Sequence, residues 1–346
     1  MSTVKVQNIQ HFSASSPAIT LAADGSVAVQ TQTGMRNRLI NGQFSIDQRN
    51  AGVNTVVASA AYGPDRWKML GEDNLGSLKA KDTTVGGGRF NLALTCVTAN
   101  NKYGILQFIE GINCKDLRGK TVTLTANLSV SNTRLGNIKM GIIEWASTED
   151  SPTSNPISTW NVEGTTPTLA ANFTFKNTPA NLNVTTTPTA YSVTATLGTT
   201  FTNLAVFIWN DDKSYTANDV VYITDVQLET GSLATPYEAR LYGAELALCQ
   251  RYYQAYFATS GRSGFRVVGY MSAGSLVIQA GLLPVVMRAT PTATKLGTWN
   301  VTNCGQPAFG TISTTGYEFY VTATALGYAD AYQDSADDGV TFSIEI

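Results

Sequence analysis

The sequence predicts an all-β protein, and three observations carry this prediction. Charged residues make up only 14% of the 346 residues, and Thr, Asn, Ser and Gly dominate the polar ones. These residue types suit strand faces and turns better than helix interiors. Apolar and polar residues alternate over 121–130, from Val122 and Leu124 onward, as in a strand with one buried face. Turn clusters such as Gly86-Gly87-Gly88 and Asn210-Asp211-Asp212 separate runs of this kind.

The N-terminal part of the chain predicts an arm followed by a large domain. A chain of 346 residues exceeds one small core, since a domain usually holds about 100 to 200 residues. Residues 1–33 carry short apolar groups and a turn at Asp24-Gly25, which predicts an extended N-terminal arm with a hairpin and no core of its own. Residues 34–238 carry signals for about nine or ten short strands, the size and rhythm of a jelly-roll β-sandwich.

The rest of the chain predicts a helix and a second domain. Residues 239–258 show a helical period, with Leu241, Ala244 and Leu248 on one stripe. The apolar arc of this connecting helix is wide, which predicts burial between the two domains or against copies of the chain. Residues 259–346 return to short strands and predict a smaller C-terminal β-sandwich.

The composition argues against nucleic acid and membranes as partners. A net charge of -2 leaves no basic surface that could bind nucleic acid. No window approaches the roughly 18 apolar residues that span a bilayer, and 1–12 lack the apolar run of a signal peptide, so we expect no membrane insertion and folding in a cytosol. The widely spaced cysteines are expected to be buried free thiols: Cys96, Cys114, Cys249 and Cys304.

The side-chain chemistry does not favour an enzyme. The single histidine, His11, lies in the arm, so both a histidine base and a zinc site lack their ligands. The acidic pairs Asp211-Asp212 and Asp337-Asp338 are expected to be solvated turn residues. Glycoside hydrolysis is the remaining enzymatic alternative, because it needs two carboxyl groups about 5 to 10 Å apart. The candidates by residue type are Glu110, Glu144, Glu149 and Asp150.

Three aromatic residues occupy the strand face opposite the predicted core. In 204–209 the aliphatic residues can face the core, which leaves Phe207 and Trp209 on the second face, and Trp145 is placed similarly. Sugars favour flat aromatic faces beside hydrogen-bonding groups. These rings therefore predict either a glycan platform or a surface that a neighbouring subunit buries.

Four tyrosines near the C-terminus form a second candidate for ligand binding. Tyrosine offers rigid amphipathic contact area at low entropic cost, which suits a recognition surface. The alternative is that they are ordinary strand and loop residues. They are Tyr317, Tyr320, Tyr328 and Tyr332, with several aspartates nearby.

Several segments, taken in order, resemble motifs of bacteriophage tail-fibre proteins. One resembles the opening of a sandwich module of phage and prophage tail proteins, a module that is itself similar to carbohydrate-binding jelly rolls. The others resemble the closing strand of that module, the helix after it, a motif of the C-terminal domain, and the N-terminus of cyanophage fibre proteins. The long shaft of full fibres is missing, which leaves tail fibre, tail tip and head-surface appendage open. In that order the segments are 37–49 with 63–67, 226–238, 245–253, 283–292 and 1–29.

The resemblance implies a virion structural protein that attaches a phage to a host-surface glycan without an enzymatic step. It implies that residues 1–33 bind other virion proteins, that the sandwich and helix assemble a homotrimer, and that the C-terminal domain faces the host. Related sandwiches often hold a structural calcium ion, for which Asp225 is the first candidate ligand. The expected location is the virion, foremost its tail, after assembly in the host cytoplasm. The alternatives are a capsid decoration, cement or head-appendage protein, and a glycan-cleaving tailspike.

Overall fold

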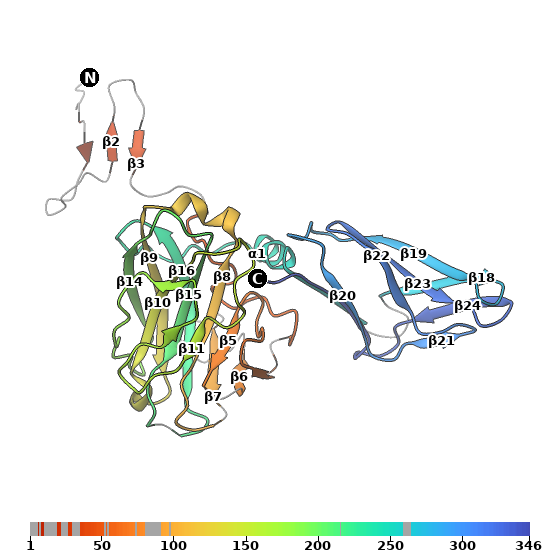
Figure 1. The fold of residues 1–346 in the computed structure, drawn as a ribbon, viewed down its shortest axis with the longest axis horizontal. Helices are drawn as coiled ribbons and strands as arrows, with labels where there is room; N and C mark the ends of the chain where they lie inside the picture. The colour runs from red at the N-terminus through yellow and green to blue at the C-terminus, as the bar shows by residue number, and fades with distance from the viewer. Residues whose placement is uncertain are drawn as a thin grey trace, which may run out of the picture.

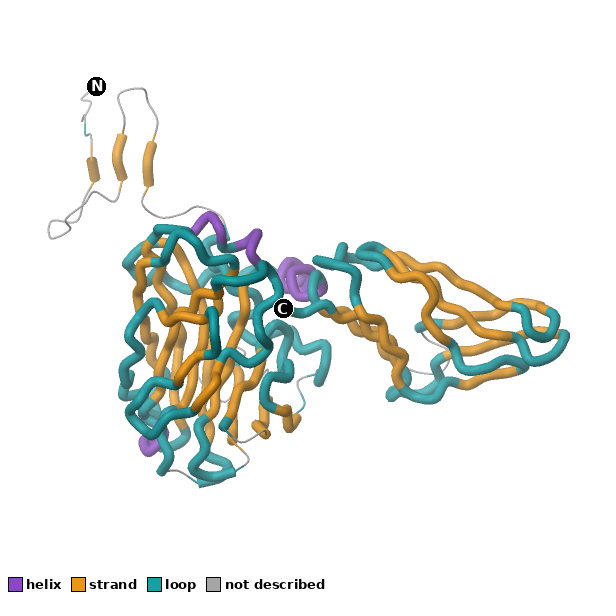
Figure 2. The backbone as a smooth tube through the Cα atoms, in the orientation of Figure 1, coloured by secondary structure: helices purple, strands orange, loops and turns teal. Residues whose placement is uncertain are grey.

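The computed structural model consists of strands and loops, with one α-helix among the described residues (Figure 1, Figure 2). The all-β prediction is confirmed. A β-sandwich is followed by the helix and by a smaller β-domain that extends away from it (Figure 1). In the described part of the chain, no helix has the length and apolar character needed to cross a membrane. The structure describes residues 6, 8–9, 19–21, 27–29, 35–51, 53, 55–72, 75–79, 91–96, 98–214, 216–258 and 264–346.

Two antiparallel sheets enclose one hydrophobic core in the sandwich. Large side chains such as Phe44 and Trp67 fill the space between the sheets. The first sheet has the order β13 (Phe173–Phe175), β10 (Ile138–Trp145), β15 (Asn203–Asn210), β8 (Tyr103–Ile109) and β5 (Lys68–Gly71). The second has the order β14 (Thr189–Thr196), β9 (Thr121–Val130), β16 (Val220–Thr230), β7 (Leu92–Cys96), β6 (Leu75–Lys79) and β4 (Thr55–Ala58).

Strand β9 confirms the alternation predicted for 121–130. Its core-facing side chains, among them Val122 and Leu124, are fully buried. The threonines between them face outward, where Thr123 Oγ1 lies 3.1 Å from Thr194 Oγ1 on β14. A strand with one buried face therefore has the period of two that the sequence shows.

A second layer covers the outer face of the five-stranded sheet. Residues 146–177 fold back over this face and include the two-stranded sheet of β11 (Ile157–Thr159) and β12 (Thr168–Leu169). Ile157 and Phe173 pack there against side chains of β10 and β15 in a separate cluster. Both faces of the sheet are buried, which explains why β10 and β15 are almost continuously apolar.

The connecting helix is shorter than the predicted span of 239–258. Helix α1 covers Tyr242–Gln250, and Tyr253–Phe257 form strand β17, which pairs with β25 (Gly339–Ser343). Pairing with a strand far along the chain overrides the local helical period. The helix buries Glu245 and Cys249, while the apolar residues at its start are exposed. Three 3₁₀ turns, η1 (Gly111–Asn113), η2 (Lys115–Leu117) and η3 (Thr133–Leu135), complete the helical structure described.

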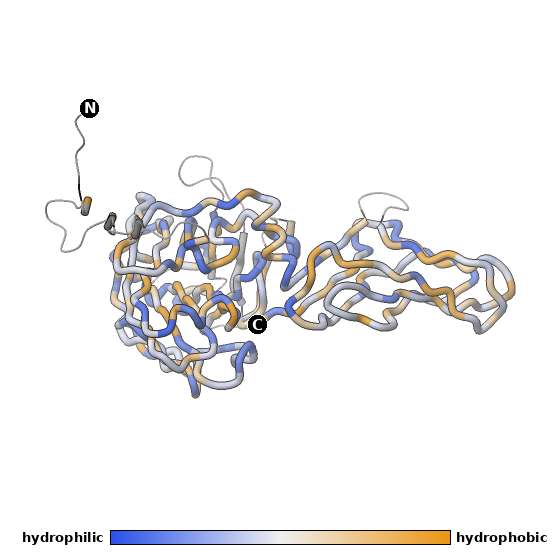
Figure 3. The backbone as a smooth tube through the Cα atoms, turned by 90° about the horizontal axis from the view of Figure 1, so that it is seen from above, coloured by the Kyte–Doolittle hydropathy of each residue, from blue (hydrophilic) through white to orange (hydrophobic). Residues whose placement is uncertain are grey.

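The C-terminal domain, residues 253–346, is here called the tip. It has its own core, in which Trp299, Phe319 and Phe342 pack together. Three antiparallel sheets form it: β17–β25–β20 (Thr292–Leu296), then β18 (Arg266–Met271)–β24 (Gly327–Tyr332)–β21 (Asn300–Thr302), and β19 (Leu276–Leu282)–β23 (Gly316–Thr322)–β22 (Ala308–Ile312). Hydrophobic segments extend along the tip to its distal end (Figure 3).

The described N-terminal residues form a small antiparallel sheet. Its strands are β1 (Asn8–Ile9), β2 (Ile19–Leu21) and β3 (Val27–Val29), and it stands beside the sandwich (Figure 1). Ile19 pairs with Val29, and Leu21 with Val27, as the predicted hairpin requires. The turn at Asp24-Gly25 lies outside the described residues.

The described cysteine side chains are buried free thiols, as predicted. Cys114, Cys249 and Cys304 have no disulfide partner. Burial raises the pKa of the Cys114 thiol to about 12, so it stays protonated at neutral pH. The side chain of Cys96 lies outside the described part of the chain.

Candidate functional site

Three of the segments that carry the resemblance to tail-fibre proteins, 37–49, 226–238 and 245–253, contact one another where the sandwich joins the tip. Asn37 accepts a hydrogen bond on its side-chain oxygen from the main-chain N–H of Leu228 in the closing strand (3.1 Å). The main-chain N–H of Asn41 donates to Glu245 of α1. Motifs that are far apart in the sequence thus build one junction between the two domains.

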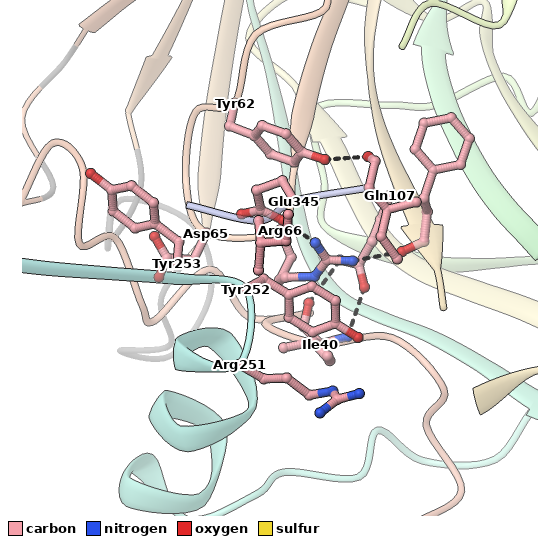
Figure 4. Close-up of polar contacts among 12 residues, drawn as sticks. Ile40, Tyr62, Asp65, Arg66, Gln107, Arg251, Tyr252, Tyr253 and Glu345 are labelled. Atoms are coloured by element: carbon pink, nitrogen blue, oxygen red, sulfur yellow. Dashed lines mark hydrogen bonds and ion pairs between the residues drawn. The ribbon is translucent and has the colours of Figure 1, made fainter. Parts of the chain in front are cut away.

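A buried ion network lies at the centre of this junction (Figure 4). Glu345, near the end of the tip, accepts from Arg66 and lies 2.8 Å from Arg49 Nη2. Arg49 also pairs with Asp65 at 3.3 Å. The Arg66 guanidinium stacks on the ring of Tyr252, 3.6 Å from its centroid. Two arginines therefore share one carboxylate that the chain brings back from the tip.

Further hydrogen bonds hold the last residues of the tip on the sandwich. The Tyr62 hydroxyl donates to the carbonyl of Ile346 (2.5 Å). Arg288 donates to the carbonyls of Ile344 (2.6 Å) and Glu345 (3.0 Å). The Arg288 bonds fix this segment within the tip, and the Tyr62 bond joins it to the residues that follow β4 in the sandwich.

Asp65 is expected to make stability fall as the pH rises through the acid range. Burial raises the pKa of this carboxyl from 3.8 to about 6, while the positive charge of Arg49 acts in the opposite direction. Between these two values the folded chain binds more protons than the unfolded chain, so the free energy of unfolding decreases as the pH rises. A shift of about two units corresponds to about 3 kcal/mol. Urea unfolding at about pH 4 and about pH 7 should show this loss for the natural chain relative to Asp65→Asn, which does not titrate. If the two proteins differed by the same free energy of unfolding at both pH values, the prediction for Asp65 would be wrong.

The outer face of the sheet β18–β24–β21 is the best candidate for a contact surface. This sheet lies toward the end of the tip remote from the sandwich (Figure 1). Val267, Ala329 and Ala331 point into the core, so the alternate residues point outward. We call this surface the tip face; its outward residues are Arg266, Val268, Tyr270, Tyr328, Asp330, Tyr332, Asn300 and Thr302.

An exposed tyrosine pair forms one end of the tip face. Tyr270 and Tyr328 are directly opposite each other on β18 and β24, and their exposed fractions are 59% and 68%. The rings meet edge to face, with centroids 5.2 Å apart and an interplanar angle of 81°. This geometry is favourable for aromatic pairs and fixes the orientation of both exposed rings at the surface.

A polar pair continues the tip face beside the tyrosines. Arg266 donates two hydrogen bonds to Asp330, at 2.8 and 2.7 Å. Tyr332 lies opposite Arg266 in the ladder. Aromatic rings and planar polar groups thus occupy neighbouring rows of one sheet, a combination that can bind polyhydroxylated ligands.

The structure separates the four tyrosines proposed from the sequence. Tyr328 and Tyr332 lie on the tip face, but Tyr320 points outward from the other sheet, opposite Ile278. Tyr317 packs on Phe342 at 5.1 Å, and burial raises its pKa. Tyr270 was not expected as a site residue from the sequence, because only its pairing with Tyr328 across the two strands brings it to this surface.

The three sandwich aromatics are core residues, so their assignment to a binding surface is wrong. Trp145, Phe207 and Trp209 are at most 5% exposed. They do lie on the second face of their sheet, as predicted. However, residues 146–177 of the same chain cover that face: Trp160 packs on Phe207 (6.0 Å between centroids), and Ile157 belongs to the same hydrophobic cluster. Within the sheet, Trp145 packs on Phe173 (4.5 Å) and Trp209 on Phe175 (5.9 Å). Neither a glycan nor a neighbouring subunit reaches these rings.

The proposed calcium ligand Asp225 lies at an irregularity of the sheet. It lies in the bulge of β16 with φ +52° and accepts a hydrogen bond from the side chain of Gln43 (2.8 Å). Among the residues that the structure describes, no group of three or more His, Cys, Asp or Glu side chains could hold a metal ion.

Of the two acidic pairs expected to be solvated, Asp211, Asp212 and Asp338 are buried, whereas Asp337 is exposed as expected. Asp211 is fully buried between Lys102 and Lys139, with Nζ–carboxylate distances of 2.5 and 2.7 Å. Asp338 accepts a hydrogen bond from the main-chain N–H of Asp334 (3.0 Å). An aspartate in a turn is exposed to solvent only when no other part of the chain supplies hydrogen-bond or ion-pair partners that bury its carboxylate.

The four candidate catalytic carboxylates are engaged in local contacts. Glu110 accepts from Arg251 and from the hydroxyl of Tyr252. Asp150 accepts from the main-chain N–H of Gly111 (2.7 Å). Glu144 accepts from the N–H of Gly198, and Glu149 pairs with Lys115.

Comparisons place the chain beside proteins with β-sandwich modules. No protein-family model matches the sequence, and no curated protein matches it. The chain is similar to the N-terminal modules of Clostridium thermocellum endo-1,4-β-D-xylanase 10B complexed with xylohexaose, at 16% identity and a TM-score of 0.34, over 55% of this chain and 30% of that chain. It is also similar to the enzymatically active domain of bacteriophage CBA120 tailspike protein 4, at 12% identity and a TM-score of 0.30, over 56% of this chain and 21% of that chain. The N-terminal tandem of carbohydrate-binding modules from Paenibacillus barcinonensis Xyn10C matches at 10% identity and a TM-score of 0.32, over 86% of this chain and 100% of that chain. Similarity at this level carries no information about ligands or activity.

Proposed function

We propose that the chain is an attachment protein of a bacteriophage particle that binds a host-surface glycan through its tip. The observation that carries this proposal is the tip face, where the exposed pair Tyr270 and Tyr328 lies beside the Arg266–Asp330 pair on a sheet remote from the sandwich. Exposed aromatic rings on a rigid sheet, with polar groups in the next row, are suited to contact with a sugar chain. The role is binding without a reaction step.

The proposed assembly is a homotrimer in the virion, with the tail as its place, formed in the host cytoplasm. Single glycan contacts are weak, so several tips on one particle multiply the binding strength. The exposed apolar residues Leu241 and Tyr242 at the start of α1 offer a surface for contact between copies. Residues 1–33 would bind other virion proteins; their described strands form a separate small sheet, too short for a stable core of its own.

Removing the two tip-face rings is expected to weaken attachment about tenfold or more, since aromatic anchors carry much of the energy of small contact surfaces. The double variant Tyr270→Ala with Tyr328→Ala is compared with Leu233→Ala, an equally exposed apolar residue on the sandwich. The measurement is binding of the labelled full chain to a panel of cyanobacterial and other aquatic bacterial cells. Equal binding by the double variant and the natural chain would refute the role of the tip face.

Immunogold electron microscopy of intact particles tests the place of the protein. Antibody against the tip should label the tail. Label scattered over the capsid would support the decoration protein instead, and release of reducing sugar from host polysaccharide would support the glycan-cleaving tailspike.

A further inference from the structure

The tip sandwich is open along the edge between β18 and β19. These strands follow each other in the chain, yet each is the edge strand of a different sheet. They approach closely at Gly269, where an added Cβ would lie 2.8 Å from the side chain of Val277. Beside this contact one cavity of about 400 Å³ lies between β18 and β19. A second cavity of about 400 Å³ adjoins it and is lined by β17, residues 264–266, Gln279 and Tyr317.

The two cavities share Arg266 and Gln279 and so form one groove, here called the edge groove. Aromatic rings line the first cavity, and aliphatic side chains of β18 and β19 line the second. The rings are those of Tyr256, Phe257, Phe265 and Tyr317.

Gln279 marks the edge groove as a site open to solvent. On β19 it shares the core-facing side with Val277, and it is paired with Phe319, which is buried. A residue in such a position is normally apolar and covered. Gln279 is instead exposed, because no strand of the described part of the chain covers the sandwich at this edge. Its amide group therefore faces the groove with both a donor and an acceptor available.

The charge of the edge groove favours a neutral ligand. Among the described residues that line the two cavities, Arg266 is the one charged residue, and Asp330 balances it through two hydrogen bonds. A free anion would have to compete with this bidentate pair. Aromatic rings, one amide and a guanidinium edge match the apolar faces and the hydroxyl groups of a sugar ring.

The length of the edge groove favours a compact ligand over an extended peptide. Only three residues of β18 and three of β19 line its narrow part, which corresponds to about 10 Å of strand. A peptide that adds to a sheet edge usually pairs over a longer stretch, and the contact of Gly269 with Val277 blocks its path. We infer that the edge groove binds a neutral saccharide unit, which would be a terminal sugar of the glycan proposed above, so this inference rests on the proposed function.

Gln279→Leu tests the inference, because leucine has a similar volume but cannot form hydrogen bonds. Saturation-transfer NMR of the full chain with D-glucose, D-galactose, N-acetyl-D-glucosamine and D-glucuronate should show contact for at least one neutral sugar. The affinity for that sugar should fall about tenfold or more in Gln279→Leu. Thr322→Val, an exposed change on the outer side of β23, is the control and should bind as the natural chain does.

The outcomes separate this inference from the proposed function. Contact with no neutral sugar, an equal signal in Gln279→Leu, or a signal only from an extended peptide would overturn the edge groove as a saccharide site. Cell binding that depends on Tyr270 and Tyr328 would in that case still support attachment. Conversely, sugar binding that depends on Gln279 in a chain that binds no cells would support the groove and refute attachment.

Discussion

Glu345→Gln lowers the free energy of unfolding by about 3 to 5 kcal/mol, because it leaves two buried arginines without their shared carboxylate. The side chains of Arg66 and Glu345 are only 1% and 7% exposed, so water cannot replace the lost partner. Glutamine keeps the size of the side chain, which limits the change to the charge. Urea unfolding at neutral pH followed by tryptophan fluorescence and circular dichroism measures the effect.

The matched control for Glu345→Gln is Asp116→Asn, which removes an ion pair at the surface. Asp116 pairs with Arg38 at 2.8 Å, but its side chain is 49% exposed. Such pairs contribute about 1 kcal/mol or less. Because Glu345 joins the tip to the sandwich, its replacement should also separate unfolding into two transitions. A loss for Glu345→Gln as small as that for Asp116→Asn would show that the junction does not couple the two domains.

Trp209→Ala destabilises the protein by about 3 to 5 kcal/mol, the usual cost of removing a large buried ring. Trp209 stacks on Phe207, with centroids 4.7 Å apart and an interplanar angle of 11°, and also packs on Phe175. Thermal and urea unfolding measure the loss. The natural comparison is Tyr328→Ala, which removes an exposed ring and should change stability by less than about 0.5 kcal/mol.

The two aromatic variants are expected to affect different properties, namely cell attachment and stability. Tyr328→Ala reduces attachment and leaves stability unchanged, whereas Trp209→Ala reduces stability first. A stable Trp209→Ala protein with impaired cell binding would restore the interpretation of this ring as a surface residue.

Local patterns predicted the strands correctly where one face of a strand is apolar and the other carries polar residues. In β9 each threonine alternates with a buried residue, so the sequence alone shows both the strand and its core side. The same logic failed at 253–257, where Tyr253, Tyr256 and Phe257 also fit a helical period. Pairing of β17 with β25 decided between the two, and that partner lies about 85 residues further along the chain.

The sequence by itself determined the all-β class, the approximate position of the helix and the core-facing side of the strands with clear alternation, because these depend on periods of two or 3.6 residues within one segment. Only the tertiary structure decided which sheets are also covered on the face that points away from the main core. Residues 146–177 bury Phe207 and Trp209, while nothing in the described chain covers Tyr270 and Tyr328. Whether an outward side chain is a core residue or a contact residue depends on segments that fold over it, and the period of its own strand contains no information about them.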